Sequence, residues 1–236
     1  MTGPRSGCRL CGEALVYREG QVPLPCALCG VESPTNARCA AGHFVCDACH
    51  AVGAFDHIEA TCKASDATDP VALALALMRS PAVPMHGPEH HFLVPAVLLT
   101  AVCNARGEPE KKPPLLAEAR ARAQAVKGGF CGLWGACGAG VGTGIFASLL
   151  TGATPLATES WALANRMTAR ALSAIADAGG PRCCKRTSLI ALEVALDALR
   201  TDHGLSLQET SVPCCEWTRF NKECQSRSCR FHRRTD

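Results

Sequence analysis

Cysteine constrains this chain more than any other residue type. It accounts for 17 of the 236 residues, and eight of the 17 lie within the first 62. Most of these eight stand in pairs separated by two residues, a spacing at which two thiolates reach one metal ion. A segment with so few large apolar side chains does not fold unaided, so we expect metal ions to replace a core in residues 1–62.

Four ligand pairs in this module make two complete four-ligand sites for two zinc ions. They are Cys8 with Cys11, Cys26 with Cys29, Cys39 with His43, and Cys46 with Cys49. A sequential arrangement joins the first pair to the second and the third to the fourth. A cross-braced arrangement joins the first to the third and the second to the fourth. Spacing leaves both open, and we expect the sequential one, with both zinc ions structural because no coordination position stays open.

The cysteine count also bears on the compartment. It is odd, and the opening MTGPRSGC leads into no apolar run, so a reducing cytoplasm is expected instead of a secreted disulfide scaffold. The uncharged stretch 128–158 is long enough to span a bilayer, but its many glycines favour a buried helix that another backbone approaches closely. A net charge of +3 is too small to indicate nucleic acid, so we expect neither a membrane nor nucleic acid as partner.

Residues 63–204 predict an α-helical domain. Asp69 followed by Pro70 has the form of an N-cap and a first helical position. Further helical segments are expected near 95–104, 114–127, 155–178 and 187–200, with no strand alternation among them. The predicted fold is therefore mainly α: a central helical domain, an N-terminal zinc-ribbon-like module (1–62) and a Cys-rich C-terminal extension (205–236).

A second group of cysteines lies in the helical block, in the segments GFCGLWGACGAGVG (129–142) and CCKRT (183–187). They are Cys131, Cys137, Cys183 and Cys184. Glycine beside cysteine lets backbone amides approach a cluster sulfur closely. The composition therefore predicts a thiolate-held metal cluster.

These segments resemble the catalytic α chain of the iron–sulfur L-serine dehydratases and the related cysteine desulfidases. The match covers residues 130–198 and is carried by Cys131, the Leu-Leu-x-Gly run ending at Gly152, Cys183 and Arg186. It implies a [4Fe-4S] cluster with an iron that no cysteine binds, and an Arg186 contact to a substrate carboxylate. Residues 172–173 (Leu-Ser) replace the middle cluster cysteine of those enzymes, so Cys137 or Cys184 would substitute for it.

The whole chain from Cys8 to His232 also resembles an uncharacterised family of Cys-rich prokaryotic proteins. The likeness is carried by the segments MHGPEHHF and CCKRT. It implies no activity.

The first of these segments contains candidate acid/base groups: His86, Glu89, His90 and His91. Imidazole near neutral pH holds a metal or moves a proton, and the carboxylate can orient it. We expect these groups on a loop that faces the same cavity as Cys131 and Cys183, with one or two of the three imidazoles reaching it.

The extension contains a third candidate metal group, made of Cys215, Cys224, Cys229 and His232. Residues 214–236 also hold six basic and three acidic side chains among three aromatic ones, a mixture that suits single-stranded nucleic acid. The favoured function is an iron–sulfur-dependent lyase of the dehydratase or desulfidase type, acting on a small amino-acid-like substrate. The alternative is a non-catalytic protein that binds metal or delivers metal or sulfur to a protein partner, and an RNA-associated zinc protein is less favoured.

Overall fold

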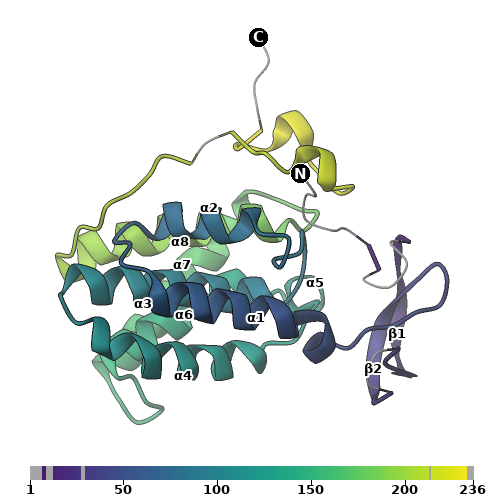
Figure 1. Ribbon diagram of the computed structural model, residues 1–236, viewed down its shortest axis with the longest axis horizontal. Helices are drawn as coiled ribbons and strands as arrows, with labels where there is room; N and C mark the ends of the chain where they lie inside the picture. The colour runs from purple at the N-terminus through teal and green to yellow at the C-terminus, as the bar shows by residue number, and fades with distance from the viewer. Residues whose placement is uncertain (1–6, 9–12, 28–29, 213, 233–236) are drawn as a thin grey trace.

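The structure is a computed structural model that describes residues 7–8, 13–27, 30–212 and 214–232. It confirms the expected class: a helical body with a small two-stranded sheet beside it and the C-terminal extension lying over α2 and α8 (Figure 1). The elements are β1 (Leu15–Pro25), β2 (Glu32–Cys39), α1 (Asp47–Ala64), α2 (Pro70–Arg79), α3 (Glu89–Ala105), α4 (Lys112–Gln124), α5 (Phe130–Leu133), α6 (Gly138–Thr151), α7 (Glu159–Asp177) and α8 (Cys184–His203). Three short 3-10 turns complete them: η1 (Pro109–Lys111), η2 (Thr218–Phe220) and η3 (Ser226–Ser228).

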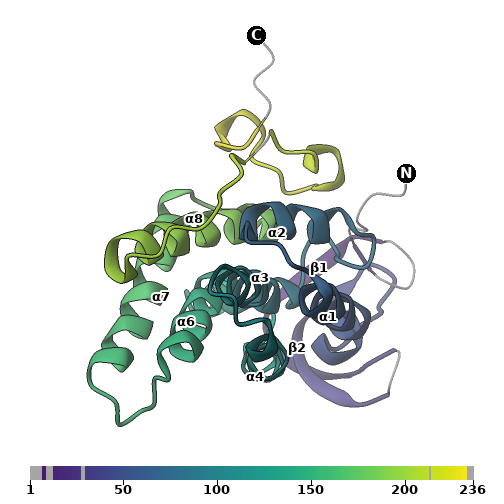
Figure 2. The same cartoon turned by 60° about the vertical axis from the view of Figure 1, so that its left-hand side comes forward.

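Helix α3 is the centre of the body. Figure 2 looks nearly along it, with α1, α2, α4, α6 and α8 arranged around it. Every residue from Glu89 to Cys103 is buried, as expected for a helix that is apolar on all sides. The helix begins at Glu89, before the predicted start at residue 95, so Glu89, His90 and His91 form its first turn and the expected loop is shorter.

Close approach of α3 and α6 depends on a proline and a glycine. Pro95 has no N–H, so the carbonyl of His91 loses its partner within α3. Gly142 of α6 packs on that carbonyl, and a Cβ at residue 142 would lie 2.9 Å from the His91 oxygen and 3.0 Å from Pro95 Cδ. The expected close backbone approach along the glycine-rich segment is therefore confirmed.

Gly138 also packs on α3, at the ring of His91, whereas the other two glycines near the start of α6 pack on α7. Gly140 packs on Leu172, and Gly144 packs on Thr168 and the carbonyl of Ala164, all in α7. Glycines at alternate positions thus let α6 fit between α3 and α7. No helix in the described part of the chain is long and apolar enough to cross a bilayer.

The helix boundaries follow local signals to different degrees. Asp69 caps α2 as predicted, because its carboxylate accepts hydrogen bonds from the amides of Val71 and Ala72, both 2.9 Å long. Helix α7 begins at Glu159, four residues after the predicted proline. Helix α8 begins at Cys184 and ends at His203, where Gly204 caps it in the left-handed region with a φ of 62°.

The N-terminal hairpin contributes little to the core. All but one residue of β1 are exposed, whereas Phe55, Ile58 and Cys62 of α1 belong to the main core. Helix α1 therefore continues from the Cys-rich module into the helical body, across residue 62.

The C-terminal extension folds back onto the body, as expected. Its Trp217 and Phe231 are buried in the main core. Arg79 of α2 pairs with Glu216, and the side-chain amide of Gln225 donates to the carbonyl of Ala178, 3.2 Å away. The extension thus lies against α2, α8 and the segment before α8.

Candidate metal centres and a thiol-lined cavity

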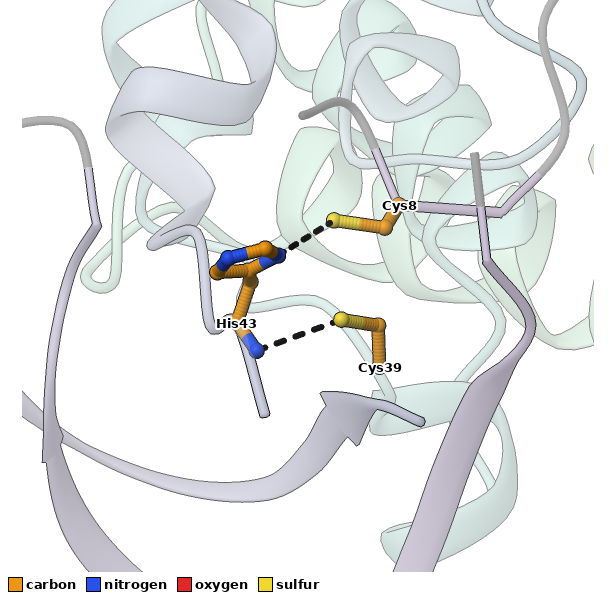
Figure 3. A group of neighbouring side chains, drawn as sticks. All are labelled: Cys8, Cys39 and His43. Carbon is orange, nitrogen blue, oxygen red and sulfur yellow. Dashed lines mark hydrogen bonds between the residues drawn. The ribbon is translucent and has the colours of Figure 1, made fainter. Parts of the chain in front are cut away.

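The first candidate metal centre lies at the open end of the hairpin. Cys8, Cys39 and His43 bring one ligand atom each within 4.8 Å of one another. Figure 3 shows the His43 ring directed at Cys8, with Nδ1 4.0 Å from the sulfur, while the His43 amide donates to Cys39 Sγ over 3.2 Å. Cys11, the predicted fourth ligand, lies outside the described residues.

The second centre joins the end of β1 to the start of α1. Cys26, Cys46 and Cys49 form a group with the same 4.8 Å limit. The Cys46 amide donates to Cys26 Sγ over 3.4 Å, and Cys46 is the N-cap of α1. Cys29, the predicted fourth ligand, also lies outside the described residues.

The sequential pairing expected from the sequence is wrong: the sets are cross-braced. Antiparallel pairing places Cys39 opposite Leu15, next to the segment that carries Cys8. The chain then returns so that the carbonyl of Phe44 accepts from the amide of Ala27, which brings Cys46 beside Cys26. Strand register decides the partners, and ligand spacing does not encode register.

A cavity of about 450 Å³ lies at the N-terminal end of α3. Three long helices, α3, α6 and α8, begin at its wall. The positive ends of their aligned peptide dipoles make such a wall favourable for thiolates and other anions. The chemistry-bearing residues that line it are Cys131, Cys137, Cys183, Cys184, His90, His91, Arg182 and Arg186.

Two histidines line this cavity. His90 Nδ1 lies 3.3 Å from the Gly87 carbonyl and 3.2 Å from Glu89 Oε1, and its buried Nε2 has no hydrogen-bond partner among the described residues. His91 Nδ1 donates to the Val126 carbonyl over 2.9 Å. Burial lowers the pKa of both, so both are neutral with a lone pair on Nε2, the state of a general base or metal ligand.

The other two predicted acid/base groups do not line the cavity. Glu89 lies behind His90 and orients its ring. His86 turns to the extension, where Nε2 is 3.1 Å from Asn221 Oδ1 and 3.2 Å from Glu223 Oε2. Desolvation lowers the pKa of His86 to about 4. Two of the three imidazoles, those of His90 and His91, therefore line the cavity, in agreement with the expected one or two.

The guanidinium groups of the two arginines in the cavity wall have different contacts. Arg186, the predicted carboxylate contact, donates from one terminal nitrogen to the carbonyls of Gly179 and Pro181, at 2.6 and 2.8 Å. It therefore holds the segment before α8 in place. Arg182, which the sequence argument missed, lies on the same wall with its guanidinium over the ring of Tyr17, 5.1 Å from the centroid. The aromatic residue of the hairpin thus reaches the edge of the cavity.

The cysteines of the wall fall into two neighbourhoods. Desolvation at the cavity wall raises the pKa of Cys131 and raises that of Cys184 to about 12, and Cys137 lies close enough to raise both further. The amide of Gly87 donates to the Cys184 sulfur, joining the histidine segment to this group. Cys183 has different neighbours. Its pKa is raised by burial and by the nearby thiols of Cys215 and Cys229, which belong to the extension.

The two hairpin groups are the tightest among the described residues. A single zinc ion with Zn–S bonds of about 2.3 Å holds its sulfurs about 3.8 Å apart. Within the described ranges only the hairpin groups bring three ligand atoms inside 4.8 Å. The hairpin groups therefore have the geometry of metal sites, whereas the cavity thiols are spread more widely.

Comparison with known families separates the N-terminal hairpin module from the rest of the chain. Residues 58–232 match the model of a family of unknown function, DUF5714. The chain belongs to this family. The family region contains the cavity and the extension and begins after both hairpin groups. No curated protein and no solved structure matches the chain, so the comparisons give no support to the expected likeness to the dehydratases.

Proposed function

We propose that this protein is a metal-dependent enzyme of the lyase type that acts on a small anionic, amino-acid-like substrate in the 450 Å³ cavity. The observation that carries the proposal is the meeting of three helix N-termini, thiols and neutral imidazoles on one wall. Perturbed titratable groups in a concave site are typical of catalysis. The two hairpin centres hold zinc and stabilise the module, with no part in the reaction.

The donor set fits a [4Fe-4S] cluster. Cys131, Cys137 and Cys184 are three neighbouring thiols, and none of them is in a disulfide. The glycines around Cys131 and Cys137 leave room for amides to approach sulfur. These three thiolates would hold such a cluster, which would supply a Lewis acid at a leaving hydroxyl or thiol. We assign Cys183 to the group in the extension, so the proposed ligand set differs from the one expected from the sequence.

The protein's own groups supply binding and proton transfer. Arg182 and the N-termini of α6 and α8 attract the substrate carboxylate. His90 Nε2 accepts the proton from the substrate carbon, since its other nitrogen is held by Gly87 and Glu89. Arg186 positions the segment that carries Arg182. We place this chemistry in the cytoplasm, where thiols stay reduced.

Metal analysis and turnover after anaerobic purification test the proposal. We expect iron, acid-labile sulfide and broad visible absorption, and release of ammonia from L-serine, L-cysteine or a related β-substituted amino acid. His90→Gln should remove turnover and leave the spectrum in place, and Cys131→Ser should change the spectrum. His203→Gln is the matched control, because it lies at the far end of α8, roughly 30 Å from Cys184. Zinc without iron, or full turnover by His90→Gln, would refute the proposal.

A delivery function for metal or sulfur is the second candidate, because Cys131 is an exposed thiol that a partner protein can reach. Transfer of labelled sulfur or metal from the protein without any change in small molecules would favour it. The RNA-associated function loses its main support, since Trp217 and Phe231 are buried and offer no stacking surface to bases.

A further inference from the structure

A second, smaller cavity lies where the C-terminal extension meets α8. Its volume is about 20 Å³, enough for one water-sized particle and too small for a cluster. Four thiols line it, together with an apolar wall that includes Trp217 and Phe231. The thiols are those of Cys183, Cys215, Cys224 and Cys229. No three of these sulfur atoms lie within 4.8 Å of one another, so a bound ion would have to draw them together.

Backbone hydrogen bonds of the extension gather these cysteines. The Cys215 amide donates to the Phe231 carbonyl over 2.6 Å, which brings the two ends of the extension together. Cys229 follows the turn η3 and donates to the Ser226 carbonyl over 2.9 Å. Cys183 is the N-cap of α8, so the fourth thiol comes from the helical body.

Backbone amides are aimed at three of the four sulfurs. The Ser226 amide donates to Cys224 Sγ over 3.3 Å, with Ser226 held at a φ of 52°. The Trp217 amide donates to Cys215, and the Arg186 amide donates to Cys183. Such bonds stabilise negative sulfur and are typical of the surroundings of metal-bound thiolates.

The charges of the surroundings fit a bound dication. Four thiolates and one divalent ion carry a net charge of −2. Lys185 and Arg186 line the same cavity and are both buried, at 1% and 5% exposed. Lys185 donates to the carbonyls of Met78 and Val83 and lies over the Trp217 ring, so its ammonium is fixed beside the sulfurs. The two buried cations therefore balance the charge that a tetrathiolate site would bring into the core.

We propose that Cys183, Cys215, Cys224 and Cys229 bind one zinc ion that holds the C-terminal extension to the first turn of α8. Cys183 is the fourth ligand in this site. The spacing of the sequence had predicted His232 as that ligand, but His232 does not line this cavity. Because Cys183 also lines the 450 Å³ cavity, the ion fixes part of the wall of that cavity. The site does not depend on the proposed lyase activity, and none of the three proposed cluster ligands belongs to it.

Zinc content of the full chain tests the site. Cys224→Ser and Cys229→Ser should each contain one equivalent of zinc fewer than the wild type. Cys214→Ser is the matched control, because Cys214 is exposed, adjacent to Cys215 and absent from the lining of the cavity, and it should keep the full content. Equal zinc in wild type and both variants would overturn the proposal. Loss of iron and sulfide in place of zinc would overturn the assignment to a single ion.

A measurement on the unaltered chain covers the case in which the variants do not fold. Iodoacetamide labelling followed by mass spectrometry should modify Cys214 at once and leave Cys215, Cys224 and Cys229 unmodified until a zinc chelator is added. The same labelling of these three with and without chelator would contradict a bound ion. Iron content and turnover, measured on the same preparations, report on the lyase proposal separately.

Discussion

The contact between α3 and α6 can be tested by adding a single methyl group. In Gly142→Ala, the new Cβ would lie 2.9 Å from the His91 carbonyl and 3.0 Å from Pro95 Cδ. Both are parts of a buried backbone segment that cannot rotate away, so the two helices must separate. Such overpacking costs about 1–3 kcal/mol. Alanine in place of glycine inside a helix contributes about 1 kcal/mol of stability in return.

Gly53→Ala in α1 is the matched control. Gly53 is also inside a helix, and no described atom lies within 4 Å of a Cβ built there. This variant should therefore gain the 1 kcal/mol without the clash. The propensity gain cancels in the comparison, and Gly142→Ala should be less stable than Gly53→Ala by about 1–3 kcal/mol.

Thermal and urea unfolding of the two variants measure this difference. At this chain length 1 kcal/mol corresponds to about 2–4 °C, so the melting temperatures should differ by several degrees. Because the contact holds the first turn of α3, Gly142→Ala should also disturb the cavity wall at His91. Equal stability of the two variants would refute the argument that glycine is needed for close packing of α3 and α6.

Three further outcomes follow from the structure. Cys26→Ser should release one hairpin metal ion and open residues 13–46 to proteolysis while α3 to α8 stay protected; equal protection in wild type and variant would contradict a metal-held module. The pKa of His86 falls from 6.5 to about 4 on folding, so the unfolded chain binds more protons between these pH values and the protein loses stability as the pH falls from 6.5 to 4. In urea unfolding at both pH values, His86→Gln should lose about 3 kcal/mol less stability than the wild type. Equal losses in the two proteins would count against the buried position of His86. Lys185→Met should lower stability by about 1–3 kcal/mol, because the carbonyls of Met78 and Val83 lose a buried donor, and an unchanged urea midpoint would exclude these bonds.

Local signals in the sequence predicted local structure well. Asp69 and Pro70 predicted the start of α2 because capping depends on neighbouring residues alone. The glycines of 138–144 predicted a helix in close contact with other backbone, since a missing side chain has that consequence in any fold. The start of α3 was missed, because buried histidines in a first turn look like a polar loop in the sequence.

The residue types of the metal centres and of the cavity were likewise determined by the sequence, since only thiolates and imidazoles at short spacing offer that chemistry. Only the tertiary structure decided which of them meet. Strand register cross-braced the hairpin ligands, and the return of the extension brought Cys183 to Cys215 and Cys229. The first turn of α3 directed His90 and His91 into the cavity and left His86 to the extension. Spacing along the chain sets which ligands can share an ion locally, whereas contacts between distant segments depend on the packing of whole helices and strands.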